Sequence, residues 1–281
     1  MGGHDAYRRS FAHTCGRTLA GLLLLAGCSS GGTPAADGTK SPAGASASGT
    51  PAPTGTGPAP SGSPARSLVP ELDEAKQPTT AAQARALIGQ IMVDQEVFGP
   101  DVVRGTPYES DPAVWPVLGP DCAWRTSGLP EDVLATSTRY FRIPPKDGRG
   151  TVRVSTTVTV HRNRAESGWE TARSMEEVMR CPDQRLNAGE QLKGLIGTAL
   201  FQGEQGNMWT EEAFAEYGEI LTAEGGPYDY TWSQGQFGPV TMAVTVKGGA
   251  GATQQSLNAL LVQGTSRMMI RAGQAIGKEA R

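Results

Sequence analysis

The sequence predicts an α+β domain in which helices pack on an antiparallel sheet. Apolar and polar residues alternate over 151–162, which is the period of a half-buried strand with one wet face. Over 165–181 the apolar residues recur instead at helical spacing. Strands followed by a helix are predicted again over 219–272. We therefore expect two β-hairpin-plus-helix units.

The first element predicted in this domain is a helix over about 80–93. Thr80 and Gln83 have the spacing of a capping box, and apolar residues then recur at helical intervals: Ala84, Leu87, Ile88, Ile91 and Met92. Four prolines interrupt the next segment, so we expect an irregular path up to Cys122: Pro107, Pro112, Pro116 and Pro120.

A hairpin is predicted next, because the β-rich segments 133–143 and 151–162 flank the turn sequence PPKDGRG. His161 falls on the polar side of the second strand, and we interpret it as an ordinary surface residue. The helix that follows ends before Pro182 and has one apolar stripe: Trp169, Ala172, Met175 and Met179.

The second unit begins with three strands joined by Gly-rich turns, predicted over 219–223, 228–233 and 239–247. A final helix is predicted over 253–272, with Thr253 as its cap. One face of this helix carries large apolar side chains: Leu257, Leu260, Leu261, Met268 and Met269.

The amino-terminal segment has the layout of an export signal. Three arginines precede an apolar stretch over 18–26, which is too short to cross a ~30 Å hydrocarbon core as a helix. After it, Ser, Gly, Thr, Pro and Ala dominate, and such a composition cannot bury enough apolar surface to order the chain. We expect a signal peptide over 1–27, a disordered linker over 28–66 and a single domain over 67–281.

The residues Leu25, Ala26, Gly27 and Cys28 resemble the lipobox of bacterial lipoproteins. The resemblance implies cleavage before Cys28, a diacylglycerol on its sulfur, and anchoring on the outer, extracytoplasmic face of the cell membrane. Stable anchoring needs more than one acyl chain, and such lipoproteins carry at least two. Segment 8–11, RRSF, also resembles the twin-arginine export motif, so the general and the twin-arginine routes both remain open.

The net charge excludes some classes of partner, and the cysteine content favours a disulfide. Without the signal peptide the chain has 22 basic and 27 acidic residues, and a net charge of −5 argues against nucleic acid or anionic lipid as a partner. Cys15 lies in the signal peptide, so the domain keeps Cys122 and Cys181. Outside the cytoplasm two such cysteines usually pair, and neither has the setting of a reactive thiol, which is the alternative.

The order of these elements, with the segments PDCAW, MRCPD and VTMAVTVKG, resembles the extracellular sensor domain of actinobacterial membrane serine/threonine kinases and of related stand-alone lipoproteins. The resemblance covers about 80–275. It implies a disulfide between Cys122 and Cys181 and a cleft between sheet and helices that holds an unknown ligand. It brings no catalytic residues.

Motifs for catalysis are scarce, and we expect neither an enzyme nor a cofactor or metal. His161 is the single histidine after the signal peptide, too few for a zinc site, and the domain has no G-x-S-x-G segment. The clustered carboxylates are interpreted as solvated faces: Glu176, Glu177, Glu211, Glu212, Glu216 and Glu219. Because glycosidases need only two carboxylates, a hydrolase of cell-wall polymer remains the alternative.

Tyr228, Tyr230 and Trp232 alternate along a predicted strand, so their rings share one face. They are either core packing or an aromatic wall of a binding cleft. Trp115, Trp124 and Trp209 lie in loop-like contexts. The sequence thus favours a lipid-anchored, non-enzymatic domain that binds an envelope ligand or protein, with a hydrolase or a structural envelope subunit as alternatives.

Overall fold

The computed structural model of the chain describes residues 70–199 and 210–279. The chain divides into two units, Met1–Ser61 and Gly62–Arg281, and every described residue belongs to the second. The predicted signal peptide, the linker, the acylation site Cys28 and Trp209 lie outside the described residues. Within these residues, none of the helices combines the length and the apolar composition needed to cross a membrane.

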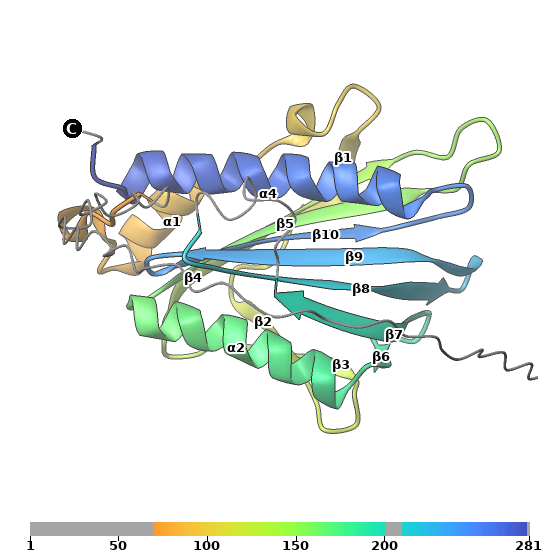
Figure 1. Cartoon of the computed structure of the whole chain (residues 1–281), viewed down its shortest axis with the longest axis horizontal. Helices are drawn as coiled ribbons and strands as arrows, with labels where there is room; N and C mark the ends of the chain where they lie inside the picture. Colours follow the sequence, from red (N-terminus) through yellow and green to blue (C-terminus); the bar gives the residue numbers. More distant parts are fainter. Residues whose placement is uncertain (1–69, 200–209, 280–281) are drawn as a thin grey trace, which may run out of the picture. The chain divides into compact units, whose positions relative to one another are not determined.

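The described residues form an α+β fold, as predicted, with three α-helices, an eight-stranded sheet and a two-stranded sheet (Figure 1). The helices are α1 (Ala81–Ile91), α2 (Arg164–Arg180) and α4 (Gln254–Ile276). The large sheet is antiparallel throughout, in the order β1-β4-β5-β10-β9-β8-β7-β6. Its strands are β1 (Val103–Glu109), β4 (Val133–Ile143), β5 (Val152–His161), β6 (Gln184–Arg185), β7 (Glu190–Ala199), β8 (Glu212–Thr222), β9 (Gly225–Phe237) and β10 (Val240–Lys247). The small sheet pairs β2 (Val114–Leu118) with β3 (Trp124–Gly128).

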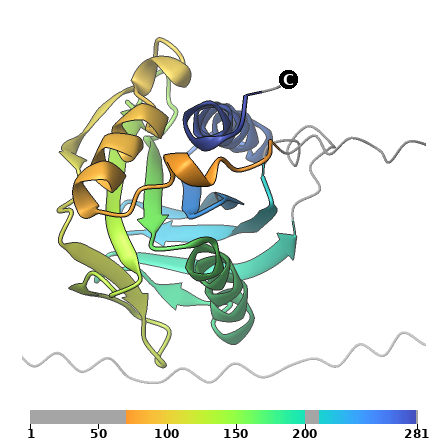
Figure 2. The same cartoon turned by 90° about the vertical axis from the view of Figure 1, so that its left-hand side faces the viewer.

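One face of the large sheet forms the main core with α1 and α4 (Figure 2). The valines that alternate along β5 point into this core, which confirms the two-residue period: Val152, Val154, Val158 and Val160. Every apolar residue predicted for the face of α4 is buried there too: Leu257, Leu260, Leu261, Met268 and Met269.

Two of the helices begin at the predicted caps. The Thr80 hydroxyl accepts a hydrogen bond from the Gln83 amide, and the Gln83 side chain accepts one from the Thr80 amide, so the capping box is complete. Thr253 caps α4 in the same way, with Ser256 as its partner. Because these bonds satisfy amides that have no partner within the helix, they set where each helix starts.

The irregular path predicted before Cys122 was wrong, because two strands occupy it. Pro107 lies in β1, the edge strand of the large sheet, and Pro116 lies in β2 of the small sheet. A strand with a free edge has backbone positions that need not donate to a neighbour, so it tolerates proline.

Strands β6 and β7 were not predicted, and β8 and β9 are longer than predicted. Gly194, with φ of +58°, lies in β7 where the pairing with β8 shifts register between Lys193 and Ile196. Such a bulge breaks the alternation of apolar and polar residues on which strand prediction depends.

The apolar stripe predicted for α2 was also wrong. Trp169 and Met179 are 64% and 76% exposed, and the buried residues are Ser167, Thr171 and Val178. The reason is that the start of α2 packs on glutamines of β9: Gln234 donates to the Thr171 hydroxyl (3.0 Å) and Gln236 to the Ser167 hydroxyl (2.8 Å). Near its end the helix shares a small apolar cluster with β7, β8 and β9: Val178, Leu192, Leu195, Phe214, Ile220 and Tyr230.

Candidate functional site

The face of the large sheet opposite α1 and α4 carries an ordered row of side chains across five strands. Strand register places Glu216 of β8 opposite Trp232 of β9, Trp232 opposite Thr245 of β10, Thr245 opposite Ser155 of β5, and Ser155 opposite Tyr140 of β4. Directly paired residues point to the same side of a sheet, so all five side chains share this face. The predicted wet face of β5 therefore belongs to a larger polar surface.

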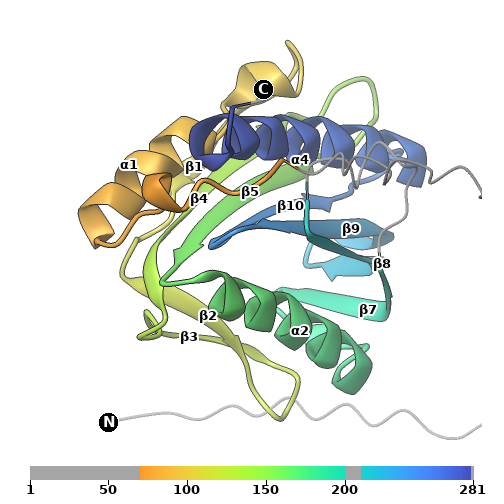
Figure 3. The ribbon, with the colours of Figure 1, turned by 60° about the vertical axis from the view of Figure 1, so that its left-hand side comes forward.

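This surface is the floor of a cleft with a cavity volume of about 1040 Å³. Helix α2 lies along one side of the floor, and the β2–β3 hairpin crosses the same face (Figure 3). The lining combines hydroxyl and amide groups with aromatic rings, among them Ser155, Thr157, Tyr140, Trp232, Gln234 and Trp124. A concave site with this mixture suits a polar organic ligand that also has flat apolar faces.

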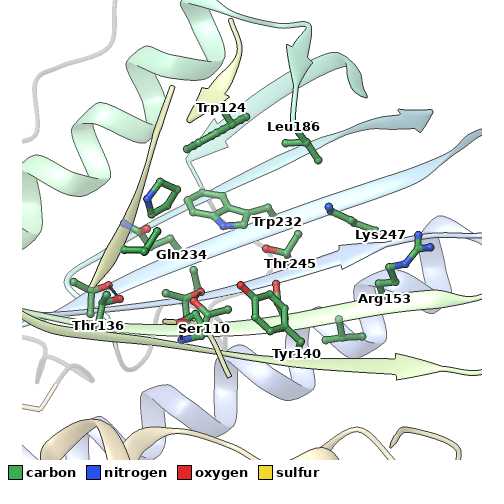
Figure 4. Close-up of a pocket in the computed structure, with 18 of the residues that line it drawn as sticks. Ser110, Trp124, Thr136, Tyr140, Arg153, Leu186, Trp232, Gln234, Thr245 and Lys247 are labelled. Atoms are coloured by element: carbon green, nitrogen blue, oxygen red, sulfur yellow. Dashed lines mark hydrogen bonds between the residues drawn. The ribbon is translucent and has the colours of Figure 1, made fainter. Parts of the chain in front are cut away.

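Aromatic rings enter the cleft from its floor and from the hairpin wall (Figure 4). Trp232 rises from the floor, and its ring meets Phe214 edge-on at a centroid distance of 6.2 Å. Trp115 and Trp124 come from the hairpin, in strands rather than in the loop-like settings expected from the sequence. The indole N–H of Trp124 donates to the Gln184 side chain at 2.7 Å, which fixes the direction of that ring.

The predicted disulfide attaches this hairpin to the end of α2. Cys122 precedes β3, Cys181 caps α2, and their sulfurs are bonded at 2.09 Å. A parallel bridge between Ala123 and Arg185 continues the attachment. The pairing implied by the family resemblance is therefore confirmed, and its role in the fold is to hold a wall of the cleft.

Hydroxyl groups cover the β4–β5 part of the floor in pairs. The side-chain oxygens of Thr136 and Thr159 are 2.9 Å apart, and so are those of Thr138 and Thr157. Tyr140 lies beside them and its hydroxyl has no hydrogen bond among the residues that the structure describes; burial raises the pKa of this phenol. These groups can both donate to and accept from a ligand hydroxyl.

The α2 end of the cleft is acidic. Glu216 is only 8% exposed, and burial, with the nearby Glu177 carboxylate as a second cause, raises its pKa to about 8. Burial also raises the pKa of Glu177, against the charges of Arg180 and Arg173. The interpretation of both glutamates as parts of solvated faces was wrong, because α2 and β8 bring them together from distant parts of the sequence.

The opposite end of the cleft carries basic residues that already have acidic partners. Lys247 contacts Glu190 at 2.8 Å, and Arg153 lies 3.7 Å from Glu190 and 3.6 Å from Glu224. Burial acts to raise the pKa of Glu190, but the hydrogen bond and charge of Lys247 lower it overall. The cleft is thus polarised, with the basic residues Lys247, Arg153 and Arg142 at one end and the carboxyl groups of Glu216 and Glu177 at the other.

His161 is fully buried, so its interpretation as a surface residue was wrong. His161 is the last residue of β5 and lies beneath α2. Its Nε2 atom is 2.6 Å from the Glu170 carboxylate, and its Nδ1 atom is 3.5 Å from the Asp132 carboxylate. The same Glu170 oxygen accepts a hydrogen bond from Thr241 at 2.6 Å. Because Glu170 also lines the cleft, this network ties a cleft wall to the floor.

The three aromatic residues singled out as ligand-binding candidates have different positions. Trp232 is half-buried and lines the cleft, whereas Tyr230 lines it but is only 5% exposed and belongs to the small apolar cluster. Tyr228 packs against that cluster and is not part of the lining. The alternation in the sequence predicted that the rings share one face of the strand. How far each ring is buried depends on how α2 packs against that face.

Residues that sequence reasoning missed as parts of the site lie on β4, β5, α2 and β8, among them Tyr140, Thr157, Glu177 and Glu216. Of these residues, the threonines of β5 could have been found from the sequence, because the alternation along this strand places them on the polar face of the sheet. Among residues 70–199 and 210–279, no group of three or more His, Cys, Asp or Glu residues is arranged to hold a metal ion.

No known protein family matches the sequence, and no curated protein is significantly similar to it. Among solved structures, the chain is similar to the extracellular domain of PknH from Mycobacterium tuberculosis. The two share 10% sequence identity with a TM-score of 0.42, and the alignment covers 69% of this chain and 98% of the other. At this degree of likeness, the function of the cleft has to be argued from its own residues.

Proposed function

We propose that this chain is a non-enzymatic, extracytoplasmic domain that binds a saccharide of the cell envelope in the cleft, in the manner of a sensor. An acyl anchor on Cys28 would hold it at the membrane, and the linker over 28–66 would separate the domain from the bilayer. The observation that supports binding is the cleft itself, with aromatic rings on its floor and on the hairpin wall, and hydroxyl pairs on its floor.

A saccharide fits this lining better than an extended peptide does. The faces of a sugar ring carry C–H groups that pack on indole rings, and its hydroxyls need partners that donate and accept at once. Trp232 and Trp124 supply the rings, and Tyr140, Thr157 and Gln234 supply such partners. In contrast, the floor from β4 to β8 consists of central strands, so a peptide could add as a strand only at β1 or at the β2–β3 hairpin.

The test is calorimetric titration of the full chain, in a non-ionic detergent, with a panel of soluble peptidoglycan fragments and neutral oligosaccharides. We expect Trp115→Ala and Trp232→Ala to weaken saccharide binding by about tenfold or more, as loss of a stacking surface implies. Trp169→Ala is the matched control, because this indole is 64% exposed on α2 and lies outside the lining. Equal losses in the control, or no saccharide binding by the wild type, would contradict the proposal.

Tyr230→Ala is a poor test of binding, although the sequence made Tyr230 a candidate ligand-binding residue. Tyr230 is 5% exposed and packs in the small apolar cluster, so truncation removes core contacts as well as any ligand contact. Tyr140→Phe separates the two effects, because it removes one hydroxyl that faces the cleft and leaves the ring in place.

A second candidate, the hydrolase, is favoured by one observation. A glycosidase needs two carboxyl groups, one of which stays protonated near neutral pH, and Glu216, with its pKa raised to about 8, lies beside the second carboxyl of Glu177. Incubation with peptidoglycan, followed by an assay for new reducing ends, distinguishes the candidates. Release by the wild type but not by Glu216→Gln would favour the hydrolase, and no release would favour the binding domain.

A further inference from the structure

Glu216 is buried in the cleft without a partner. Its residue is 8% exposed, and among the described residues its carboxyl has neither a hydrogen bond nor an ion pair. Other carboxylates of the lining do have partners: Glu170 contacts His161 and Thr241, and Glu109 contacts Arg139. A buried acid that no protein group satisfies costs free energy, and such groups cluster where a ligand binds.

The charged groups around Glu216 leave its end of the cleft negative. Glu177 faces it from α2, and the only titratable neighbour on β9 that acts on it electrostatically is Tyr230, a neutral phenol whose pKa is raised. Arg173 and Arg180 lie along α2 and act on Glu177. In contrast, Lys247 and Arg153 lie at the far end of the floor and are engaged by acidic partners, and Arg142 of β4 lines the cleft opposite Arg153 in the strand register.

An aromatic ring adjoins this carboxyl. Trp232 is the direct cross-strand neighbour of Glu216, so the two side chains project into the cleft side by side. Figure 4 shows the indole of Trp232 in the middle of the cleft, and Trp124 on the β3 strand of the hairpin. The face of an indole attracts a cation, most strongly where water is excluded.

We infer that Glu216 and Glu177 bind an ammonium group of the ligand, with the Trp232 ring packed beside it. The ligand class is therefore a primary amine carried on a sugar-sized polar ring, such as an unacetylated amino sugar. An ammonium has three N–H donors, enough for both carboxyl groups, and hydrogen bonds between charged partners are about twice as strong as neutral ones. This inference rests on the proposed function, because it concerns the same cleft.

Binding of an amine should change the protonation of Glu216. In the free protein the Glu216 carboxyl holds its proton near neutral pH, because its pKa is raised to about 8. An ammonium favours the ionised carboxylate, so the proton leaves to the buffer when the amine binds. Binding of the amine should therefore release up to one proton at pH 7, and its affinity should increase as the pH rises toward 8.

Two probes of the same ring size test this: cyclohexylamine, whose amine stays charged near neutral pH, and cyclohexanol, which has no charge. The full chain is titrated with each probe by calorimetry in phosphate and in HEPES, two buffers that differ in ionisation enthalpy and carry no primary amine. We expect the amine to bind at least about tenfold more tightly than the alcohol, as a charge-assisted hydrogen bond implies, and to release a proton.

Glu216→Gln keeps the size of the side chain and removes its charge, so we expect the preference for the amine to fall below about threefold and proton release to cease. Glu219→Gln is the matched control, since Glu219 lies three residues along the same strand, on the opposite face and exposed to solvent. It should preserve both the preference and the proton release.

Equal binding of both probes, or a preference that persists in Glu216→Gln, would overturn the inference while leaving the cleft as a binding site for neutral ligands. Binding of the amine without proton release would also overturn it, because Glu216 would not have been ionised. If saccharides bind in the panel experiment but cyclohexylamine does not bind here, only the ammonium inference fails. If neither saccharides nor either probe binds, the proposed function fails with it.

Discussion

At the scale of single residues, the cleft depends on side chains whose chemistry changes with their surroundings. In the sequence Glu216 is one of several nearby glutamates, and nothing there distinguishes it from Glu212 or Glu219. The strand period places it on the same face as Phe214 and Ile220, and α2 then covers that face. The strand was predicted to begin only at residue 219, so the face of Glu216 was not predicted, and the burial that raises its pKa comes from a helix about 40 residues away in the chain.

The raised pKa of Glu216 should appear in the stability of the free protein. The carboxyl has a pKa of about 8 when folded against a model value of 4.5, so the folded chain holds a proton that the unfolded chain has lost between these pH values. The free energy of unfolding should therefore fall as the pH rises through this window, by on the order of 5 kcal/mol in all.

Urea denaturation of the wild type and of Glu216→Gln between pH 5 and pH 8 checks this expectation. The glutamine variant should match the wild type near pH 5 and become the more stable protein toward pH 8. Parallel pH profiles for the two proteins would show that the carboxyl is ionised in the folded state and that the electrostatic description of this end of the cleft is wrong.

At the scale of elements, α2 and the β2–β3 hairpin form the walls, and polar contacts hold α2 in place. The bounds of α2 were predicted within a residue, because the change to helical spacing and the terminal Cys-Pro are local signals. The predicted face was wrong, because the prediction assumed that the large apolar residues point inward. Since α2 packs on glutamines and a histidine of the sheet, Ser167 and Thr171 face inward and Trp169 faces solvent.

His161→Phe should loosen α2. The change removes the partner of Glu170, whose carboxylate then keeps only its bond from Thr241. A half-satisfied buried carboxylate costs about 2–3 kcal/mol, so we expect that loss in the free energy of unfolding. Hydrogen exchange should also show faster exchange of the α2 amides than of the α4 amides. An unchanged stability would indicate that His161 contributes packing alone.

Cys122→Ala with Cys181→Ala should free the hairpin. The two cysteines are 59 residues apart, and in the chain-entropy model a bridge across such a loop contributes about 4 kcal/mol. Denaturation with and without reductant gives the same comparison in the wild type. Saccharide binding should weaken at temperatures where the variant is still folded, because Trp115 and Trp124 lose their fixed positions. Full binding by the folded variant would show that the hairpin is not a functional wall.

At the scale of the whole molecule, the large sheet has two faces with different roles. Local patterns were sufficient to predict the α+β class, the β4–β5 hairpin, the caps of α1 and α4, and the cysteine pair. They could not give β6 and β7, where a bulge interrupts the period, or the strand order, which joins β5 to β10 across about 80 residues. The cleft exists only because of that order, so no single segment could reveal it.

The central claim is that the polar face of this sheet, and not the face that carries α1 and α4, binds the ligand. Adjacent residues of β5 provide the most direct test, because Thr157 and Thr159 face the cleft while Val158 and Val160 face the core. Methyl NMR spectra of the full chain, labelled at Thr and Val, would be recorded during titration with soluble peptidoglycan fragments. We expect the methyl signals of Thr157 and Thr159 to shift, with little change in those of the two valines. Shifts confined to residues outside the cleft would contradict the claim that this face binds the ligand.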